Sequence, residues 1–145
     1  MAVHYIPPGY HTVTPYLVIH NVAAVLDFVK KAFDAKETHP AMKRPDGAVM
    51  HAEVQIGDSR IMMGEASAQH PPIPAMLYLY VPDCDAWYQR ALEAGGVSVM
   101  APMDHFYGDR SGGVKDPAGN QWWIGTHIED VSPEEIQRRA SQAKG

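Results

Sequence analysis

The feature that most constrains the fold is a similarity between the two halves of the chain at a fixed offset. An apolar run over 16–19 leads to Asn21, and a second apolar run over 78–81 leads to Asp83. Asn and Asp are favoured as helix N-caps, so each run predicts a strand followed by a capped helix. The positions of the two caps give the offset, 83 − 21 = 62. Such a regular offset indicates an internal repeat.

The second part of each half keeps the same spacing. Turns that begin at Gly57 and Gly119 share the offset of the caps, since 119 − 57 = 62. The remaining strands are expected near 37–42, 48–56, 59–65, 97–101, 106–115 and 121–127. Each half therefore predicts a βαβββ unit. Because the halves share few identical residues, chance similarity of two amphipathic segments is the alternative to a true repeat.

Length and spacing together predict a single α+β domain. At 16.0 kDa the chain has the size of one ordinary domain. After the second unit, Ser132 suits a helix N-cap and Pro133 suits the first helical position, which predicts an appended C-terminal helix. The expected bounds are 1–145 for the domain, about 12–128 for its core, about 12–66 and 74–128 for the repeats, and 132–142 for the appended helix.

Charge and composition exclude several classes of function. The formal net charge is −5, from 17 acidic and 12 basic residues, so a nucleic acid is not an expected partner. The sequence shows neither an apolar run long enough to span a bilayer nor the pattern of a secretory signal. Cys84 is the single cysteine, which fits a reducing compartment. We expect a cytoplasmic protein with no membrane partner.

Strand alternation divides the segment 48–56 into two faces. One face is apolar and should lie beneath the helices, whereas the other carries His51, Glu53 and Gln55. The same alternation assigns further residues to the non-helix face: Tyr16, Met63, Glu65, Met76, Tyr78, Tyr80, Trp123 and His127. This mixture is typical of a pocket for a small organic molecule. A solvent-exposed sheet face is the alternative, and it explains the polar residues better than the aromatic ones.

These segments resemble the vicinal oxygen chelate superfamily, the glyoxalase I, bleomycin-resistance and extradiol dioxygenase group, and in particular its PhnB-like branch. The resemblance covers about 12–128. It rests on the segments TPYL at 14–17, HAEVQIGDS at 51–59, YGDR at 107–110 and KDPAGNQW at 115–122. It implies that the two βαβββ units form one curved, barrel-like mixed sheet with the helices on its outer face. It also implies a homodimer.

Metal-dependent members of the superfamily take four His, Gln or Glu ligands from the first and fourth strands of each unit. Matching the strands puts Thr14, Ile61, Met76 and Trp123 at these four positions. None of these side chains is a suitable ligand for a catalytic divalent cation. The resemblance therefore implies the fold of the superfamily without its usual metal chemistry.

A relocated metal site is an alternative, with His51, Glu65 and His127 as ligands for zinc or nickel. Glu65 and His127 are themselves related by the offset, since 127 − 65 = 62, and His51 shares their predicted face. An ordinary hydrogen-bonded pocket, which requires no cofactor, is the other interpretation of the same three residues.

For chemistry without a metal, His51 and Glu53 are the candidate catalytic pair, because a carboxylate fixes the tautomer of a nearby imidazole and raises its basicity. Passive binding of water or a ligand is the alternative role. Tyr107 and Arg110 lie in the loop that resembles the family motif. Arg110 is expected either to hold an anionic group of a ligand or to pair with Asp109 and shape the loop.

Three functions follow from these residues and this resemblance. The first is a homodimer that lacks the metal quartet and binds a small organic ligand in the sheet cavity, with or without metal-independent catalysis. Its ligand-binding residues are the non-helix-face set together with Tyr107 and Arg110. The second is a glyoxalase-type lyase or isomerase with the relocated metal. The third is a resistance protein that sequesters a cationic drug in an acidic groove of the dimer.

Overall fold

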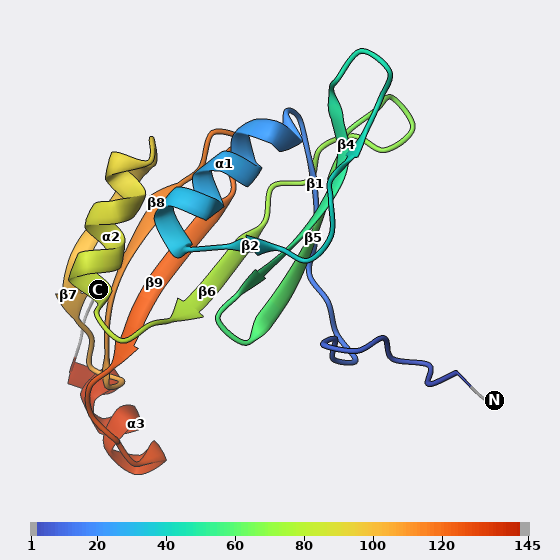
Figure 1. Cartoon of the computed structure of the whole chain (residues 1–145). Coiled ribbons are helices and arrows are strands. Elements are labelled where there is room, and N and C mark those ends of the chain that lie inside the picture. Colours follow the sequence, from blue (N-terminus) through green and yellow to red (C-terminus); the bar gives the residue numbers. More distant parts are fainter. Residues whose placement is uncertain (1–2, 143–145) are drawn as a thin grey trace.

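The computed structural model describes residues 3–142, and Figure 1 shows the arrangement of their helices and strands. The first unit contains β1 (Tyr16–Ile19), α1 (Val22–Phe33), β2 (Lys36–Glu37), β3 (Met42–Lys43), β4 (Val49–Ile56) and β5 (Ser59–Glu65). The second unit contains β6 (Met76–Tyr80), α2 (Cys84–Glu93), β7 (Val97–Asp104), β8 (Asp109–Lys115) and β9 (Gln121–His127). Helix α3 (Pro133–Gln142) follows. The strand expected near 37–42 is thus divided into β2 and β3.

The strands form two mixed sheets, and α1 and α2 cover the same side of them (Figure 1). The first sheet has the order β1-β5-β4-β2, with β3 also paired to β4, and the second has the order β6-β9-β8-β7. β1 is parallel to β5 and β6 is parallel to β9, whereas the other pairs are antiparallel. The predicted α+β class, with two units and a C-terminal helix, is confirmed.

The two sheets are separate, so the expectation of one continuous barrel-like sheet is wrong. β1 and β6 are each at the edge of their own sheet. On the free side of β1, the backbone N–H of Ile73 donates to the carbonyl of Val18 at 3.0 Å. The segment that connects the two units thus pairs with β1 at this point, and within residues 3–142 no ladder joins β1 to β6.

Aromatic side chains in the core join the two units beneath the helices. The ring centroid of Phe33, at the end of α1, lies 5.1 Å from that of Trp122 in β9 and 6.3 Å from that of Trp87 in α2. Phe28 meets Phe33 edge to face at 5.7 Å. Phe28, Phe33 and Trp122 are almost fully buried. Because large buried rings contribute strongly to core stability, this contact holds the units together although their sheets are not continuous.

The offset between the units decreases by one before their last strands. Tyr16 and Tyr78 are counterparts at the original offset, since 78 − 16 = 62. Tyr16 pairs with Met62, whereas Tyr78 pairs with Trp123, and 123 − 62 = 61. The decrease arises in the connections before the last hairpin, because the last hairpin is longer in the second unit than in the first. The last hairpin of the first unit has a two-residue turn, whereas that of the second unit has a five-residue loop.

This change of one position reverses the predicted faces of β5. Ile61 and Met63 are 5% and 0% exposed and lie in the core beneath the helices. Met62 is half-buried on the opposite face, beside Tyr16. The predictions that Ile61 occupies a metal position and that Met63 contacts a ligand are therefore wrong. In β9 the predicted faces are correct, because Trp122 is buried in the core.

The Asp-Pro-Ala-Gly-Asn segment before β9 has a structural role. The buried carboxylate of Asp116 accepts hydrogen bonds from the backbone N–H groups of Ala118 at 2.8 Å and Asn120 at 3.0 Å. It also accepts from Nδ2 of Asn120 at 3.0 Å and from Nε1 of Trp122 at 2.9 Å. Oδ1 of Asn120 accepts from the backbone N–H of Ala75 at 2.9 Å. The loop thereby connects the start of β9 to the start of β6.

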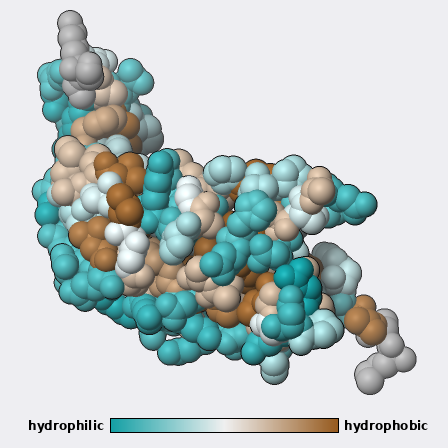
Figure 2. All heavy atoms as spheres, turned by 90° about the horizontal axis from the view of Figure 1, so that it is seen from above, coloured by the Kyte–Doolittle hydropathy of each residue, from teal (hydrophilic) through white to brown (hydrophobic). Residues whose placement is uncertain are grey.

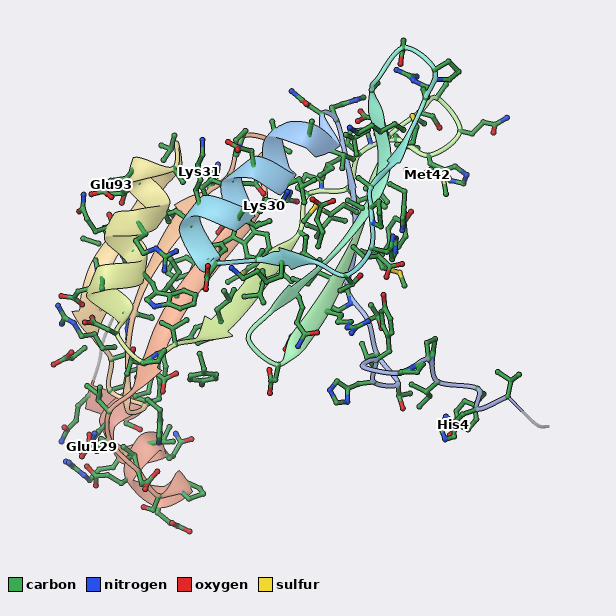
Figure 3. The ribbon with its side chains drawn as sticks, in the orientation of Figure 1. His4, Lys30, Lys31, Met42, Glu93 and Glu129 are labelled. Carbon is green, nitrogen blue, oxygen red and sulfur yellow. The ribbon has the colours of Figure 1, made fainter. Side chains whose placement is uncertain are left out.

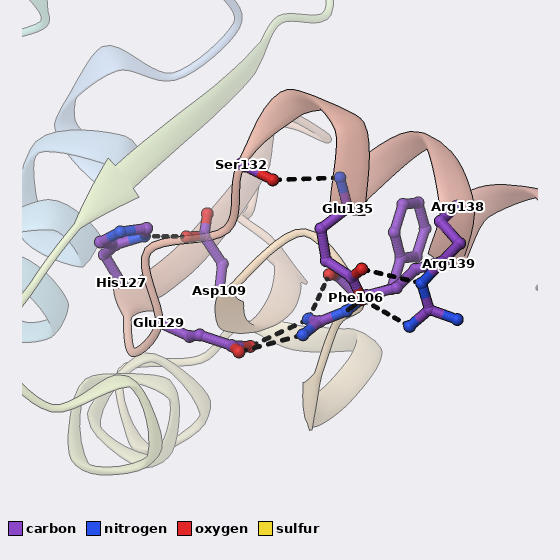
Figure 4. A network of polar contacts seen from close by, with 8 residues as sticks. All are labelled: Phe106, Asp109, His127, Glu129, Ser132, Glu135, Arg138 and Arg139. Carbon is purple, nitrogen blue, oxygen red and sulfur yellow. Dashed lines mark hydrogen bonds and ion pairs between the residues drawn. The ribbon is translucent and has the colours of Figure 1, made fainter.

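The two ends of the described chain lie away from the paired sheets. His4 lies on the N-terminal arm, far from the sheets (Figure 3). At the other end, the predicted helix is present as α3, held by Arg139. The guanidinium of Arg139 contacts Glu129 at 2.9 Å, Glu135 at 2.8 Å and the carbonyl of Phe106 at 3.0 Å (Figure 4). Among the helices of residues 3–142, none is long and apolar enough to cross a bilayer.

We expect Asp116→Ala to lower the free energy of unfolding by about 3 kcal/mol, because four donors lose a buried charged acceptor. Asp27→Ala is the matched control, since Asp27 is exposed and its contact with Lys31, at 2.9 Å, is a surface ion pair. Such a pair contributes less than about 1 kcal/mol. Urea unfolding followed by tryptophan fluorescence measures both variants. Equal losses in the two variants would contradict the structural role.

Candidate functional site

Each sheet has a face without a helix cover, and on each a tyrosine lies against a glycine of the last strand. The side chain of Tyr16 contacts Gly64 in the first sheet, and Tyr78 contacts Gly125 in the same way in the second. A β-carbon at either glycine would overlap the tyrosine. A glycine within a strand commonly marks such a close approach. The two glycines therefore allow the tyrosine hydroxyls to reach polar residues of the neighbouring strand.

On the first sheet, Tyr16, His51 and Glu53 form a line of polar contacts. The hydroxyl of Tyr16 is 3.3 Å from Nδ1 of His51, and Nε2 of His51 is 3.5 Å from Oε1 of Glu53. Oε2 of Glu53 lies 3.3 Å from Nε2 of His39 and 3.5 Å from the hydroxyl of Thr38. The structure thus brings the predicted catalytic pair together, with a largely buried carboxylate beside the imidazole. Such a carboxylate orients the ring.

Glu65 stabilises the start of α1. Its carboxylate accepts hydrogen bonds from the backbone N–H groups of Asn21 at 2.9 Å and Val22 at 3.0 Å. Thr126 has the same role in the second unit, where its hydroxyl accepts from the N–H of Cys84 at 2.8 Å. Acceptors are favourable at helix N-termini, where N–H groups lack intrahelical partners. The structure therefore gives Glu65 a structural role at the start of α1.

On the second sheet, Asp109 is the centre of a hydrogen-bond network. Its Oδ2 accepts from the hydroxyls of Tyr78 at 2.9 Å and Tyr80 at 2.8 Å, and its Oδ1 lies 2.9 Å from Nδ1 of His127 (Figure 4). Nε2 of His127 lies 2.7 Å from Oδ1 of Asp130, so the imidazole bridges two carboxylates. The side chain of Asp109 is only 5% exposed. The accessible parts of this Asp109 network are therefore the tyrosines and His127.

The network determines the charge of its members. Burial opposes ionisation of Asp109, but hydrogen bonds from His127, Tyr80 and Tyr78 outweigh it and lower the pKa of Asp109 below its ordinary value. Hydrogen bonds to Asp109 and Asp130 raise the pKa of His127. Burial raises the pKa of Tyr78, and the hydrogen bond to Asp109 raises the pKa of Tyr80. At neutral pH Asp109 is therefore a carboxylate, and both tyrosines keep their protons.

A groove of about 720 Å³ separates β6 from the hairpin that joins β4 and β5. Seen from above, the molecule is bent, and hydrophobic side chains are visible between the polar ones (Figure 2). The groove has mainly apolar walls, which include Ile61, Met76, Leu79 and Trp87, together with Tyr78 and Tyr80. A groove of this size and lining is typical of small-molecule sites. Because Tyr78 and Tyr80 also bind Asp109, the groove adjoins the Asp109 network.

Arg110 and Tyr107 have partners within the protein, and Arg110 does not pair with Asp109. The guanidinium of Arg110 pairs with Asp85 at 2.7 Å and with Asp104 at 3.0 Å. It is therefore bound to two surface carboxylates, and Asp109 has other partners. Tyr107 stacks on His105 with ring centroids 5.1 Å apart, outside the groove lining.

Gln55 and Trp123 are also outside the groove lining. Oε1 of Gln55 accepts a hydrogen bond from Nε of Arg60 at 3.1 Å. Nε1 of Trp123 donates to Oε1 of Gln121 at 3.1 Å, and its ring lies against Gly113. Both residues lie on the faces that the alternation predicts, but their polar groups have partners within the protein.

The metal positions of the superfamily do not fit a metal in this chain. With the corrected register of β5 they correspond to Thr14, Met62, Met76 and Trp123. Methionine and tryptophan side chains do not bind a catalytic divalent cation, and a single threonine hydroxyl is a poor ligand. The correction therefore changes one of the four residues, from Ile61 to Met62, and leaves the conclusion unchanged.

The relocated metal site is not supported by the geometry. His51 lies on the first sheet and His127 on the second, and the carboxylate of Glu65 is bound to backbone N–H groups. Within residues 3–142, no three His, Cys, Asp or Glu side chains converge in a way that could hold a metal ion. The alternative interpretation, a zinc or nickel site at these three residues, therefore does not fit their positions in the structure.

Asp109 is the candidate site residue that the sequence reasoning did not identify. From the sequence it is a loop residue and a partner for Arg110, whereas in the structure it begins β8 directly opposite His127. Residues opposite each other in an antiparallel pair lie close together. The register between β8 and β9 is the signal that would have identified the Asp109–His127 pair. This register depends on the length of the loop that joins the two strands.

These features define a protein of two βαβββ units whose uncovered sheet faces carry tyrosine, histidine and carboxylate groups in place of a metal quartet. Residues 10–124 match the Glyoxalase/Bleomycin resistance protein/Dioxygenase superfamily, and the chain belongs to this superfamily, as the resemblance predicts. An uncharacterized protein of Mycobacterium bovis is 36% identical over 139 residues, covering 88% of this chain and 91% of that protein. An uncharacterized protein of Mycobacterium tuberculosis is also 36% identical, with coverages of 88% and 81%.

Several solved structures share this fold. TioX from Micromonospora sp. ML1 has a TM-score of 0.67 at 20% identity, covering 81% of this chain and 99% of TioX. A glyoxalase/bleomycin resistance protein/dioxygenase from Nocardioides has a TM-score of 0.63 at 17% identity, with coverages of 85% and 87%. The fosfomycin resistance protein FosX from Mesorhizobium loti has a TM-score of 0.60 at 13% identity, with coverages of 88% and 97%. At these identities the likeness establishes the fold alone.

The contact between Asp109 and His127 is expected to stabilise the fold most at pH values between 3.8 and 6.5, which are the ordinary pKa values of the two groups. The pKa of Asp109 is lowered from 3.8, so its contribution is present above pH 3.8 and is lost as the pH falls through the folded pKa. The pKa of His127 is raised from 6.5, so its contribution is complete below pH 6.5 and is lost as the pH rises through the folded pKa.

NMR titration is expected to give a His127 midpoint above 6.5, because both ring nitrogens face carboxylates. Asp130→Asn should lower this midpoint, since it removes one of the two charges, whereas Asp27→Asn on α1 should leave it unchanged. A midpoint at or below 6.5 in the unaltered protein would show that the bridge does not form in solution.

Proposed function

We propose that the protein binds a small organic molecule in the groove beside β6, without the metal quartet of its superfamily. The groove itself is the observation that carries this proposal: about 720 Å³ and mainly apolar, with few polar residues in its lining, among them Asp58 and Ser59. Such a lining suits a ligand that buries apolar surface and makes few directed hydrogen bonds. Sequestration of a drug is one of the three functions inferred from the sequence. It is the form of this binding function in which the ligand is held without chemical change.

Catalysis on a bound molecule is a second candidate function, and the contacts of His51 favour it. Tyr16 and Glu53 flank the imidazole, which is the arrangement of a general acid or base with its orienting carboxylate. These residues are on the uncovered face of the first sheet and not in the groove lining. Catalysis would therefore need a ligand that extends beyond the groove, and for this reason we rank binding ahead of catalysis.

We also propose that two copies associate as a homodimer and that the protein is cytoplasmic. Large apolar side chains are exposed on the edge strand β7, among them Val97, Val99 and Met103. Exposed apolar residues on edge strands are commonly covered by a partner subunit. Cys84 is a buried free thiol, which is consistent with a reducing compartment.

Met76→Ala is expected to weaken the binding of Nile red, a neutral apolar dye, by about three- to tenfold, because the truncation removes apolar contact from the groove wall. Met42→Ala is the matched control. Met42 has nearly the same exposure, 64% against 66%, but lies on β3 outside the groove lining (Figure 3). Fluorescence titration of the dye measures both variants. Equal weakening by the two, or no dye binding by the unaltered protein, would refute the proposal.

Light scattering at micromolar protein concentration is expected to give twice the 16.0 kDa mass of one chain, because the exposed edge strands and apolar side chains would then be covered. Val97→Lys, on an exposed face of the edge strand β7, tests whether that edge takes part in association. A single-chain mass for the unaltered protein would contradict the homodimer.

A further inference from the structure

Strand β6 borders the groove with its free edge. Among the described strands it pairs only with β9, and every residue of β6 is part of the groove lining. Two hydrogen bonds determine which backbone groups of this segment face β9. The N–H of Gln121 donates to the carbonyl of Ala75 at 2.9 Å. The N–H of Val81 donates to the carbonyl of Gly125 at 2.8 Å.

The backbone groups of Met76, Tyr78 and Tyr80 therefore face the free edge. In a strand, the N–H and C=O groups of successive residues point to alternate sides. These three residues alternate with the ones that bond to β9, from Ala75 to Val81. Within residues 3–142, no backbone hydrogen bond from another segment reaches them. The edge thus offers a row of donors and acceptors along the groove, which is a template for a further strand.

The internal repeat shows how the equivalent edge is covered in the first unit. Val18 in β1 is the counterpart of Tyr80, since 80 − 18 = 62. The carbonyl of Val18 accepts from the N–H of Ile73 at 3.0 Å, in an antiparallel bridge. Ile73 lies between two prolines, which favour an extended backbone. An extended apolar segment therefore covers the edge of β1, whereas β6 has the same backbone groups without such a cover.

We propose that the ligand of the groove is an extended peptide that adds a strand to β6 and pairs with the backbone of Met76, Tyr78 and Tyr80; this inference rests on the proposed binding function. In strand addition, backbone hydrogen bonds give affinity and alternate side chains give specificity. The lining side chains are mainly apolar, so the directed hydrogen bonds of a ligand are made with the backbone of β6. The same lining suits apolar side chains of the peptide.

Calorimetric titration with the uncharged hexapeptide acetyl-Thr-Val-Thr-Val-Thr-Val-amide tests this proposal, because a peptide of about this length spans the five residues of β6. Two N-methylated forms are compared, one methylated on its threonine nitrogens and the other on its valine nitrogens. Only one form loses the donors that face β6, since alternate N–H groups point to opposite sides. We expect that form to bind about tenfold or more weakly than the other.

The outcomes separate this inference from the proposed function. Equal affinities of the two methylated forms overturn the inference, because the backbone donors of the peptide would then have no defined direction. Binding of Nile red without binding of the hexapeptide also overturns the inference and leaves the proposed function standing. Failure of both the hexapeptide and Nile red to bind overturns the proposed function as well.

Met76→Pro and Met76→Ala form a matched pair of variants. Both remove the methionine side chain, but only proline also removes the N–H at the free edge. Proline is tolerated on an edge strand where the N–H faces away from the sheet. We expect Met76→Pro to bind the unmethylated hexapeptide about threefold or more weakly than Met76→Ala. Equal affinities of the two variants overturn the inference.

Light scattering on the same two variants tests a second copy as the alternative occupant of this edge. A dimer that is lost in Met76→Pro but kept in Met76→Ala would assign the edge to a second copy and overturn the inference. Urea unfolding shows whether Met76→Pro is folded. If it is not, the two methylated peptides decide the question with the unaltered protein.

Discussion

The close approach of a tyrosine to a glycine on each uncovered sheet face determines the polar chemistry of this molecule. Gly64 and Gly125 leave no side chain above the last strand of their units, so the tyrosine of each first strand crosses that strand and places its hydroxyl beyond it. In the first unit this hydroxyl reaches His51, and in the second it reaches Asp109. One repeated backbone geometry thus creates two different polar centres, because β4 and β8 carry different side chains at the point that the tyrosine reaches.

Those parts of the fold that depend on local contacts could be predicted from the sequence. Asn21 accepts from the backbone N–H three residues later at 3.2 Å, Asp83 does the same at 3.1 Å, and Ser132 does so at 3.1 Å. Each cap involves neighbours in sequence, so the residue types near it suffice. The register of β5 is different, because it depends on pairing with β1 and β4 and on the length of every connection. A fixed offset could not reveal the change of one position that buries Ile61 and Met63.

The candidate site shows the same division between local and distant contacts. His51 and Glu53 are two residues apart on one strand, so their shared face follows from the period of a strand. Asp109 binds Tyr78, 31 residues earlier in the chain, and His127, 18 residues later. Strand alternation predicts that Glu65 lies on the polar face of its strand. It does not show that the carboxylate of Glu65 accepts a hydrogen bond at the start of α1, 43 residues earlier in the chain. The sheet face on which a side chain lies could therefore be predicted, but its hydrogen-bond partner could not.

The change of residues at the metal positions and the character of the groove are physically connected. Met62, Met76 and Trp123 stand where metal-dependent members of the superfamily have polar ligands. Such ligands contribute to binding mainly when a metal is held, whereas an apolar side chain contributes about 25 cal/mol for each Å² that a ligand buries. In the binding function that we propose, Met76 would do so directly, because it lines the groove. For that proposed function, the residues at the quartet positions would therefore supply apolar contact area in place of Lewis-acid chemistry.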